Sequence, residues 1–201
     1  MIAVSEQVAG IVLAAGGSTR FGRPKPLLPW GEQTLLAHIL DQIASLGLYD
    51  LVVVTGAAGD AVAQVVAQRA RIAHNPKWKM GQSTSLRAGL RALRPDAAAV
   101  IFFLADQPEA HPEVAQQLIS RWQTTRALAV APRYQGQRGT PVLFDRRAFA
   151  ELSALEGDVG GCVLLVRHSA EVAWVDVPCP PPLDVDTPED YYRCLANRSL
   201  P

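Results

Sequence analysis

The sequence predicts an α/β protein with three layers, in which helices cover both faces of a mostly parallel sheet. Two observations lead to this prediction. Apolar runs without polar alternation recur along the chain, such as Val8–Ala14 and Ala98–Leu104, and this pattern is typical of parallel strands buried on both faces. Segments with the apolar spacing of helices separate these runs, as in a doubly wound sheet. Such folds bind ligands at the carboxyl ends of their strands, so we expect a site in the loops that begin at Gly16 and Asp106.

The first half of the chain alternates strands with helices. Val8–Ala14 is an apolar run that stops at a glycine pair, and Thr34–Leu46 has apolar residues at helical spacing before Gly47. Glycine commonly follows the last residue of a helix. Leu51–Val54 is rich in β-branched residues, which favours a strand. The further elements predicted in this half are helices over Asp60–Ala70 and Ser83–Leu93 and a strand over Ala98–Leu104.

The last third of the chain has shorter segments and more loops. A helix over Pro112–Trp122 and a strand over Ala127–Ala131 complete the regular alternation. Three short segments then follow between loops rich in glycine and proline, at Val142–Phe144, Gly161–Arg167 and Ala173–Val177. They suggest an added lobe or an added edge of the sheet. The prolines between positions 178 and 182 predict a stiff connector.

Composition indicates one globular domain over residues 1–201. Hydrophobic residues make up 49% of the chain and charged residues 19%, which allows a core and excludes disorder by composition. The 19 basic and 19 acidic residues balance, whereas a general nucleic-acid binder has a basic excess. No apolar run is long enough to span a membrane, and the first residues lack the features of a signal peptide. With three cysteines and no CxxC spacing, we expect a cytoplasmic protein.

The most informative stretch is Leu13–Gly31, which reads LAAGGSTRFGRPKPLLPWG. Its glycines at 16, 17 and 22 allow positive φ angles and let amide groups face an anion. Arg20, Arg23 and Lys25 add three cations to the same loop. The stretch matches neither the P-loop pattern nor the GxGxxG dinucleotide fingerprint. These features favour a cradle for a nucleoside triphosphate over the alternative, a surface loop with solvated cations.

The same stretch resembles the opening signature of a known enzyme family. Leu13–Trp30 follows the pattern L-A-A-G-x-S-x-R-F-G-x-x-K-x-L-L-P-W, which is similar to that of the MobA-like nucleotidyltransferases, and among them the molybdenum cofactor cytidylyltransferases. Later segments resemble family motifs in the same order, so the resemblance covers nearly the whole chain. They are Asn75–Leu90 (N-P-x-W and G-Q-S-x-S-L), Asp106–Pro108 (D-Q-P), Gly157–Gly160 (G-D-x-G) and Asp184–Tyr191 (D-V-D-T-P-E-D-Y).

The resemblance implies the fold of the nucleotide-diphospho-sugar transferases, with a Rossmann-like nucleotide-binding half at about residues 1–110 and an acceptor-binding half at about 111–201. CTP is the favoured nucleotide, because L-A-A-G and the later Pro-Trp differ from the pattern of the guanylyl enzymes. The implied nucleotide-binding residues are Leu13, Ala14, Ala15, Gly16, Gly17, Ser18, Lys25, Gln82, Ser83, Ser85 and Asp106. Ser83 has a plainer alternative role as a helix cap.

Two carboxylates are candidate ligands for Mg²⁺, which prefers one or two protein carboxylates together with phosphate oxygens and water. Asp106 follows an apolar strand, so its side chain belongs at the edge of the site, although an aspartate there is by itself more often a turn or cap residue. The second ligand is Asp184 or Asp186. Resemblance to related nucleotidyltransferases ranks Asp184 first. Asp186 comes second, because alternate residues of an extended segment share a face.

The acceptor-binding residues and the acceptor itself are inferred from the resemblance alone. Gly139, Thr140, Pro141 and Asp158 are the implied acceptor-binding residues, and molybdopterin is the favoured acceptor. The family usually has G-H-P where this chain has Gly-Thr-Pro, which leaves the acceptor open. The alternatives are a cytidylyl-, uridylyl- or guanylyltransferase that acts on a sugar or alcohol phosphate, and a module that binds nucleotide or cofactor without turnover. An NAD-linked oxidoreductase is disfavoured by the absence of GxGxxG.

The expected reaction is attack by a phosphate oxygen of the acceptor on the α-phosphorus of CTP, with release of pyrophosphate. The expected catalytic residues are Arg20, Lys25 and Asp106. Arg20 and Lys25 would bind the triphosphate and stabilise the departing pyrophosphate, while Asp106 would hold Mg²⁺. We expect no nucleic-acid or membrane partner, and a transient contact with a molybdoenzyme or its chaperone.

Overall fold

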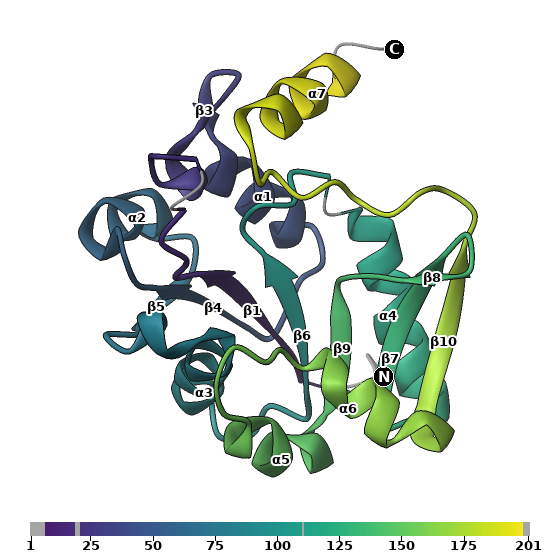
Figure 1. The fold of residues 1–201 in the computed structure, drawn as a ribbon. Coiled ribbons are helices and arrows are strands. Elements are labelled where there is room, and N and C mark those ends of the chain that lie inside the picture. The colour runs from purple at the N-terminus through teal and green to yellow at the C-terminus, as the bar shows by residue number, and fades with distance from the viewer. Residues whose placement is uncertain (1–6, 19–20, 110, 199–201) are drawn as a thin grey trace.

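The computed structural model describes residues 7–18, 21–109 and 111–198. Figure 1 shows one sheet through the middle of the molecule, with helices on both sides. The strand order is β10-β7-β9-β6-β1-β4-β5, and β8 pairs with β7. The strands of this sheet are β1 (Val8–Ala14), β4 (Asp50–Thr55), β5 (Arg71–His74), β6 (Ala99–Leu104), β7 (Ala129–Tyr134), β8 (Gln137–Arg138), β9 (Val142–Asp145) and β10 (Val172–Val177). A small hairpin of β2 (Pro29–Trp30) and β3 (Gln33–Thr34) stands apart from it.

The sheet is mostly parallel, as the sequence predicts. Strand β1 is parallel to β4 and to β6, β4 is parallel to β5, and β7 is parallel to β10. The antiparallel exceptions are β9, which runs against both β6 and β7, and the short β8, which runs against β7. The last third of the chain therefore extends the edge of the same sheet and does not form a separate lobe.

Two helical layers cover the sheet, because alternate strand residues point to opposite faces. On β6, Ile101 and Phe103 pack toward one layer, whereas Val100 and Phe102 pack toward the other. The first layer contains α1 (Leu35–Ala44), α2 (Gly59–Val66), α4 (Pro112–Thr125) and α7 (Pro188–Arg198). The second layer contains α3 (Gln82–Ala92), α5 (Phe149–Ala154) and α6 (Cys162–Arg167). The predicted three-layer α/β/α class is confirmed.

Three local differences from the sequence prediction have physical reasons. Helix α2 ends at Val66 instead of Ala70, because Gln68 has a left-handed φ of 65°. Strand β5 escaped prediction because it is an edge strand in which only Ala73 is buried. Helix α5 was not predicted, because its six residues are too few to show a clear apolar period.

The segment after β10 crosses back over the carboxyl edge of the sheet. Residues 178–187 form neither helix nor strand, as expected for a proline-rich connector. Figure 1 shows that the connector leads to α7, which lies beside the β2–β3 hairpin. There Tyr191 donates a hydrogen bond from Oη to Pro29 O, and its ring packs edge-on against Phe21 at 6.0 Å between centroids. The end of the described chain is thus joined to the loop after β1.

No helix in the described ranges is both long enough and apolar enough to cross a membrane.

Candidate active site

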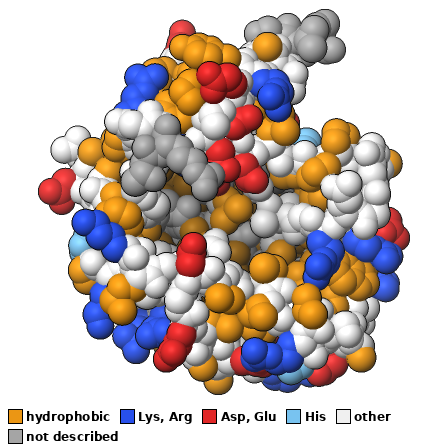
Figure 2. Space-filling view, viewed as in Figure 1, with side chains coloured by type: hydrophobic (Ala, Val, Ile, Leu, Met, Phe, Trp, Pro, Cys, Tyr) orange, Lys and Arg blue, Asp and Glu red, His pale blue; other side chains and the backbone are white. Residues whose placement is uncertain are grey.

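A cavity of about 720 Å³ lies at the carboxyl ends of β1 and β6, where the fold class places ligands. Figure 2 shows the molecule hollowed on this face, with acidic side chains along the upper border of the hollow. Many residues predicted from the sequence line the cavity. They are Leu13, Ala14, Ala15, Gly16, Gly17, Ser18, Lys25, Gln82, Ser85, Asp106, Asp158 and Asp186.

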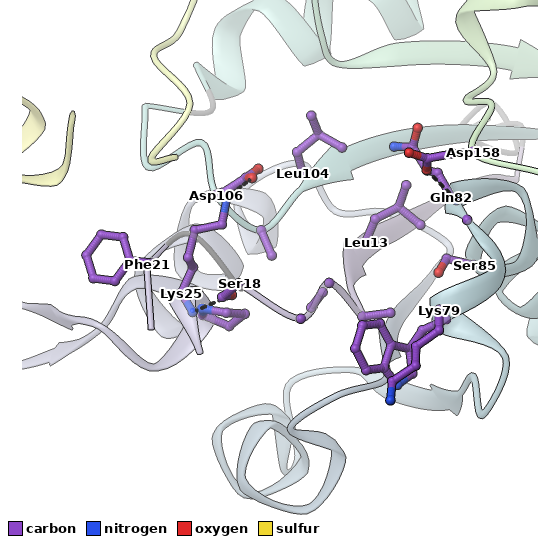
Figure 3. Close-up of a pocket in the computed structure, with 18 of the residues that line it drawn as sticks. Leu13, Ser18, Phe21, Lys25, Lys79, Gln82, Ser85, Leu104, Asp106 and Asp158 are labelled. Atoms are coloured by element: carbon purple, nitrogen blue, oxygen red, sulfur yellow. Dashed lines mark hydrogen bonds and ion pairs between the residues drawn. The ribbon is translucent and has the colours of Figure 1, made fainter. Parts of the chain in front are cut away.

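Lys25 lies between two carboxylates at one end of the cavity. Its Nζ donates to Asp106 Oδ2 at 2.8 Å and to Asp186 Oδ1 at 2.9 Å, and Figure 3 shows Lys25 and Asp106 pointing toward one another. Burial lowers the pKa of Lys25, but the two carboxylates outweigh burial and hold this pKa above its usual value. The ammonium group is therefore charged at neutral pH. It joins the loop after β6 to the segment before α7.

Asp184 makes a different contact. Its Oδ1 accepts a hydrogen bond from Gln107 Nε2 at 2.8 Å, and Asp184 is absent from the described residues that line the cavity. Burial raises the pKa of Asp184, and the neighbouring charges of Asp106 and Asp186 add to this, although the bond from Gln107 acts against it. Asp186, and not Asp184, thus shares the Lys25 ammonium with Asp106, whereas the resemblance ranks Asp184 first as the second metal ligand.

Ser18 closes the loop after β1. The N–H groups of Phe21 and Gly22 donate to Ser18 O at 3.0 and 3.1 Å, and the main-chain N–H of Lys25 donates to Ser18 Oγ at 3.0 Å. Positive φ angles of 50° at Ser18 and 75° at Gly22 make this tight turn possible. The loop thereby directs the Lys25 side chain toward the cavity. Arg20, the other expected triphosphate ligand, lies outside the described residues.

The start of α3 is joined to a loop from the second half of the chain. Gly81 has a φ of 107°, and a Cβ at this position would lie 2.4 Å from the backbone of Gly157, so the approach requires glycine. Ser83 Oγ donates to Gly157 O at 2.7 Å, and Asp158 Oδ1 accepts from the N–H of Gln82 at 3.0 Å. Figure 3 shows Asp158 beside Gln82. Asp158 thus satisfies a main-chain donor in the first turn of α3.

The serines of α3 have separate environments. Ser83 is fully buried and binds the Gly157 loop, so its side chain neither lines the cavity nor caps the helix. Ser85 lines the cavity, and its Oγ accepts a hydrogen bond from Asn75 Nδ2 at 3.0 Å. Of the two, Ser85 is the one within reach of a ligand in the cavity.

Gly139, Thr140 and Pro141 do not line the cavity. The Thr140 hydroxyl donates to Gln107 Oε1 at 2.6 Å, and the Thr140 carbonyl accepts from Tyr134 Oη at 2.9 Å. A Cβ at Gly139 would lie 2.6 Å from the Tyr134 ring, so this glycine is needed for packing. Gly139 and Thr140 therefore contact other parts of the protein in this structure.

The sequence reasoning missed one wall of the cavity as a candidate site. This wall is η2 (Trp78–Met80), in which Lys79 Nζ lies 5.4 Å from the centroid of the Trp78 ring. The Met80 side chain is 63% exposed, although apolar side chains of this size usually lie inside. The tryptophan of the N-P-x-W motif was the available signal, because Trp78 lies three residues before Gly81, the residue that precedes α3.

The arrangement suits a divalent cation and a polyphosphate. Asp106 and Asp186 already bind one cationic group in common, and such hard oxygen donors are the ligands that Mg²⁺ prefers. Within the described ranges, no group of three or more His, Cys, Asp or Glu side chains could hold a metal. Mg²⁺ at a nucleotide usually has one or two protein carboxylates as ligands, together with phosphate oxygens and water.

The chain is similar to a known family and to several known proteins. The family described as MobA-like NTP transferase domain matches residues 10–172. A nicotine blue oxidoreductase from Paenarthrobacter nicotinovorans is 33% identical over 94% of this chain and 96% of its own length. The molybdenum cofactor cytidylyltransferase of Escherichia coli K12 is 25% identical over 90% of this chain and 92% of its own length.

One similar solved structure contains a metal. It is Rv0371c from Mycobacterium tuberculosis H37Rv in complex with manganese, which is 33% identical, has a TM-score of 0.82, and covers 96% of this chain and 100% of its own. This complex points to the use of a divalent metal in the family. The resemblance seen in the sequence is confirmed, and because the family match spans most of the chain, the protein belongs to the MobA-like family of nucleotidyltransferases.

Proposed function

We propose that this protein transfers CMP from CTP to molybdopterin in the cytoplasm and releases pyrophosphate. The observation that carries the proposal is Lys25 between Asp106 and Asp186 at the end of the cavity. The lysine supplies a positive group for a triphosphate, and the carboxylates supply oxygen ligands for a divalent cation. Positioning and charge neutralisation of this kind are the main requirements of transfer at phosphorus.

In the proposed reaction, a phosphate oxygen of the acceptor attacks the α-phosphorus of CTP. As the new bond forms, the bond from the α-phosphorus to the bridging oxygen breaks, and its electron pair leaves with pyrophosphate. The attacking oxygen is already anionic, so the reaction requires neither a general base nor a covalent enzyme intermediate. The protein contributes alignment and stabilisation of the charge that develops.

Lys25 is the described residue that we expect to contact the triphosphate. Its side chain is 15% exposed at the cavity, so a rotation of its flexible stem can carry the ammonium from the carboxylates to phosphate oxygens. Its main-chain bond to Ser18 keeps the glycine loop beside it, where main-chain amides of residues 16–18 can reach the same phosphates. Arg20 is expected to add a second cation.

We propose that Asp106 and Asp186 hold Mg²⁺. Both carboxylates fit this role because they share one cation within hydrogen-bond distance. Asp184, which the resemblance ranks first, contacts Gln107 and is assigned no ligand role in this proposal. When bound, Mg²⁺ would neutralise phosphate charge and help to align the reacting groups.

The choices of CTP and molybdopterin rest on likeness. The L-A-A-G stretch at Leu13–Gly16 and the Pro29–Trp30 pair resemble the cytidylyl enzymes, and the Escherichia coli relative is named a molybdenum cofactor cytidylyltransferase. A sugar or alcohol phosphate remains the alternative acceptor because of Gly-Thr-Pro at 139–141. If the product is a molybdenum cofactor, its transfer to a molybdoenzyme or a chaperone would follow.

The first test measures nucleotide binding and turnover. CTP, GTP, ATP and UTP are compared with Mg²⁺ by thermal shift, since a ligand that binds only the folded state raises the melting temperature. We expect the largest shift with CTP, and pyrophosphate release from CTP only when molybdopterin is present. A preference for another nucleotide would contradict the CTP assignment. Turnover with a sugar phosphate but not with molybdopterin would contradict the acceptor.

A second candidate function is an oxidoreductase, and the relative named nicotine blue oxidoreductase favours it. The same cavity of about 720 Å³ is large enough for a nucleotide cofactor. The discriminating measurement is the oxidation of NADH or NADPH by the purified protein with nicotine blue as acceptor. Turnover of reduced nicotinamide without pyrophosphate release would establish the oxidoreductase and refute the transferase.

A further inference from the structure

Three side chains connect the loop before β9 to the segment before α7. The Thr140 hydroxyl donates to Gln107 Oε1 at 2.6 Å, and Gln107 Nε2 donates to Asp184 Oδ1 at 2.8 Å. Gln107 is 8% exposed, so its amide has little competing water. We call this connection, from Thr140 through Gln107 to Asp184, the latch. It joins three parts of the chain that are far apart in sequence.

The latch has a fixed direction. An ionised carboxylate can only accept hydrogen bonds, so Asp184 must receive the NH₂ group of Gln107. The amide oxygen of Gln107 can only accept, so Thr140 must donate its hydroxyl proton. Rotation of the amide by 180° would still let its NH₂ group donate to the Thr140 hydroxyl, but it would place the amide oxygen against the carboxylate, where two acceptors meet without a proton between them. Each member of the latch therefore determines the orientation of the next.

Both ends of the latch are anchored by other contacts. At one end, Tyr134 Oη donates to the Thr140 carbonyl at 2.9 Å. At the other end, the N–H of Val185 donates to Asp106 O at 2.8 Å, and the Val185 side chain is fully buried. The latch and the Val185 contact together fasten the segment 184–186 to the loop after β6, which carries Asp106.

Asp186 depends on this fastening for its position. Its side chain is 50% exposed and bonds to the flexible Lys25, so its own packing does little to fix it. Its main-chain N–H donates to the Asp184 carbonyl at 3.1 Å, which ties it to the residue that Gln107 holds. A displacement of Asp184 would therefore move Asp186 relative to Asp106.

We propose that Gln107 and Thr140 are positioning residues that set the distance between the Asp106 and Asp186 carboxylates. This inference rests on the proposed function, because it takes these two carboxylates as the metal ligands. Contacts behind a metal ligand orient it, and their loss typically weakens metal binding by about 10–100-fold. The loop implied for the acceptor thus acts on the metal side of the site through Gln107.

The test compares Thr140→Val with Thr140→Ser. Valine removes the hydroxyl at nearly constant volume, whereas serine keeps it, so the pair separates the hydrogen bond from packing. Mn²⁺ is titrated into the nucleotide-free protein, and free Mn²⁺ is followed by electron paramagnetic resonance. We expect Thr140→Val to weaken Mn²⁺ binding about tenfold, and Thr140→Ser to stay within about twofold of the unchanged protein. Thermal unfolding checks that both variants are folded.

Gln107→Met is the second variant, because it keeps the length of the side chain and removes both latch bonds. It should weaken Mn²⁺ binding at least as much as Thr140→Val. Equal Mn²⁺ affinity in the folded variants and the unchanged protein would overturn the inference, as would the absence of Mn²⁺ binding by the unchanged protein. These titrations use no nucleotide, so normal Mn²⁺ results without CTP turnover would refute only the proposed function.

Discussion

The two regions of the sheet use their polar groups differently. In residues 7–109, the loop after β1 and the turn after β6 line the cavity, to which they contribute main-chain groups and the side chains of Lys25 and Asp106. In residues 111–198, many polar side chains hold protein to protein, as Asp145 does with Trp122 Nε1 at 2.9 Å and Asp158 does with the start of α3. Asp158 and Asp186 are the two charged side chains of this region that line the cavity. Substitutions in the first region should therefore reduce activity, and substitutions in the second should reduce stability.

Asp106→Ala should have the largest effect on activity. Loss of one of two carboxylates at the cation position should reduce pyrophosphate release roughly 10²–10³-fold. The side chain is 28% exposed, so we expect little change in melting temperature. The matched control is Asp176→Ala, which removes an aspartate that is 76% exposed and pairs with Arg133 on the second region. Full activity in Asp106→Ala, or an equal loss of activity in Asp176→Ala, would contradict the assignment of activity to the first region.

Lys25→Met should separate nucleotide binding from metal binding. Loss of a charged contact to the triphosphate should weaken CTP binding up to about a hundredfold, as measured by calorimetry. In the absence of nucleotide, the same variant should bind Mn²⁺ more tightly, because the ammonium no longer competes for Asp106 and Asp186. Lys77→Met, at an exposed lysine outside the cavity, is the control and should change neither affinity. Unaltered CTP affinity in Lys25→Met would refute the triphosphate role.

Gly81→Ala tests the junction of the two regions. The substitution combines an unfavourable φ of 107° with a contact of 2.4 Å to Gly157, so the free energy of unfolding should fall by about 2 kcal/mol or more. Gly136→Ala is the matched control, since Gly136 has a φ of 85° and open space around its Cβ position. It should cost about 1 kcal/mol from backbone strain alone. Equal losses in urea unfolding would show that the contact with Gly157 is unimportant.

Asp145→Asn should have the smallest effect, and the effect should depend on pH. Burial raises the pKa of Asp145, but hydrogen bonds from Arg147 and Trp122 outweigh burial, so the pKa of the folded state lies below its usual value. The carboxylate therefore stabilises the fold above the pKa of the unfolded state, which is about 3.9. This contribution is lost as the pH falls through the lower pKa of the folded state.

Urea unfolding at several pH values measures this dependence. At pH 7 we expect Asp145→Asn to lower the free energy of unfolding by about 1 kcal/mol. The difference from the unchanged protein should shrink as the pH falls below about 4, while activity at pH 7 stays the same. A difference that persists undiminished in acid would show that packing, not charge, explains the loss.

The fold of the first region followed from the sequence because its strands are apolar on both faces. Their own apolar residues are enough to identify two of these strands, β1 and β6. Strand β5 was missed because an edge strand buries little. Strand β9 was expected to be a short segment, but its antiparallel direction depends on the path of the chain from β7, which local apolar spacing does not specify.

The candidate site was predictable to the extent that each residue is placed by its own loop. Lys25 lies in the long segment that follows β1, and Asp106 lies in the turn directly after β6, so both belong to loops that the fold class places at the carboxyl edge of the sheet. The choice between Asp184 and Asp186 depends on partners, because Asp184 bonds to Gln107 whereas Asp186 bonds to Lys25. The direction of the Thr140 side chain depends on the same partner. Spacing along the sequence does not reveal which side chain forms such a hydrogen bond.

The bond between Lys25 and Asp186 spans 161 positions of the sequence, and this span has a consequence for folding. Contacts between distant residues form late, because the chain between them must first be ordered. A molecule whose first region has folded, but whose last helix has not docked, lacks the second carboxylate at the cation position. Nucleotide and metal together should therefore bind only the completed fold, and by binding it they would draw late intermediates toward the native state.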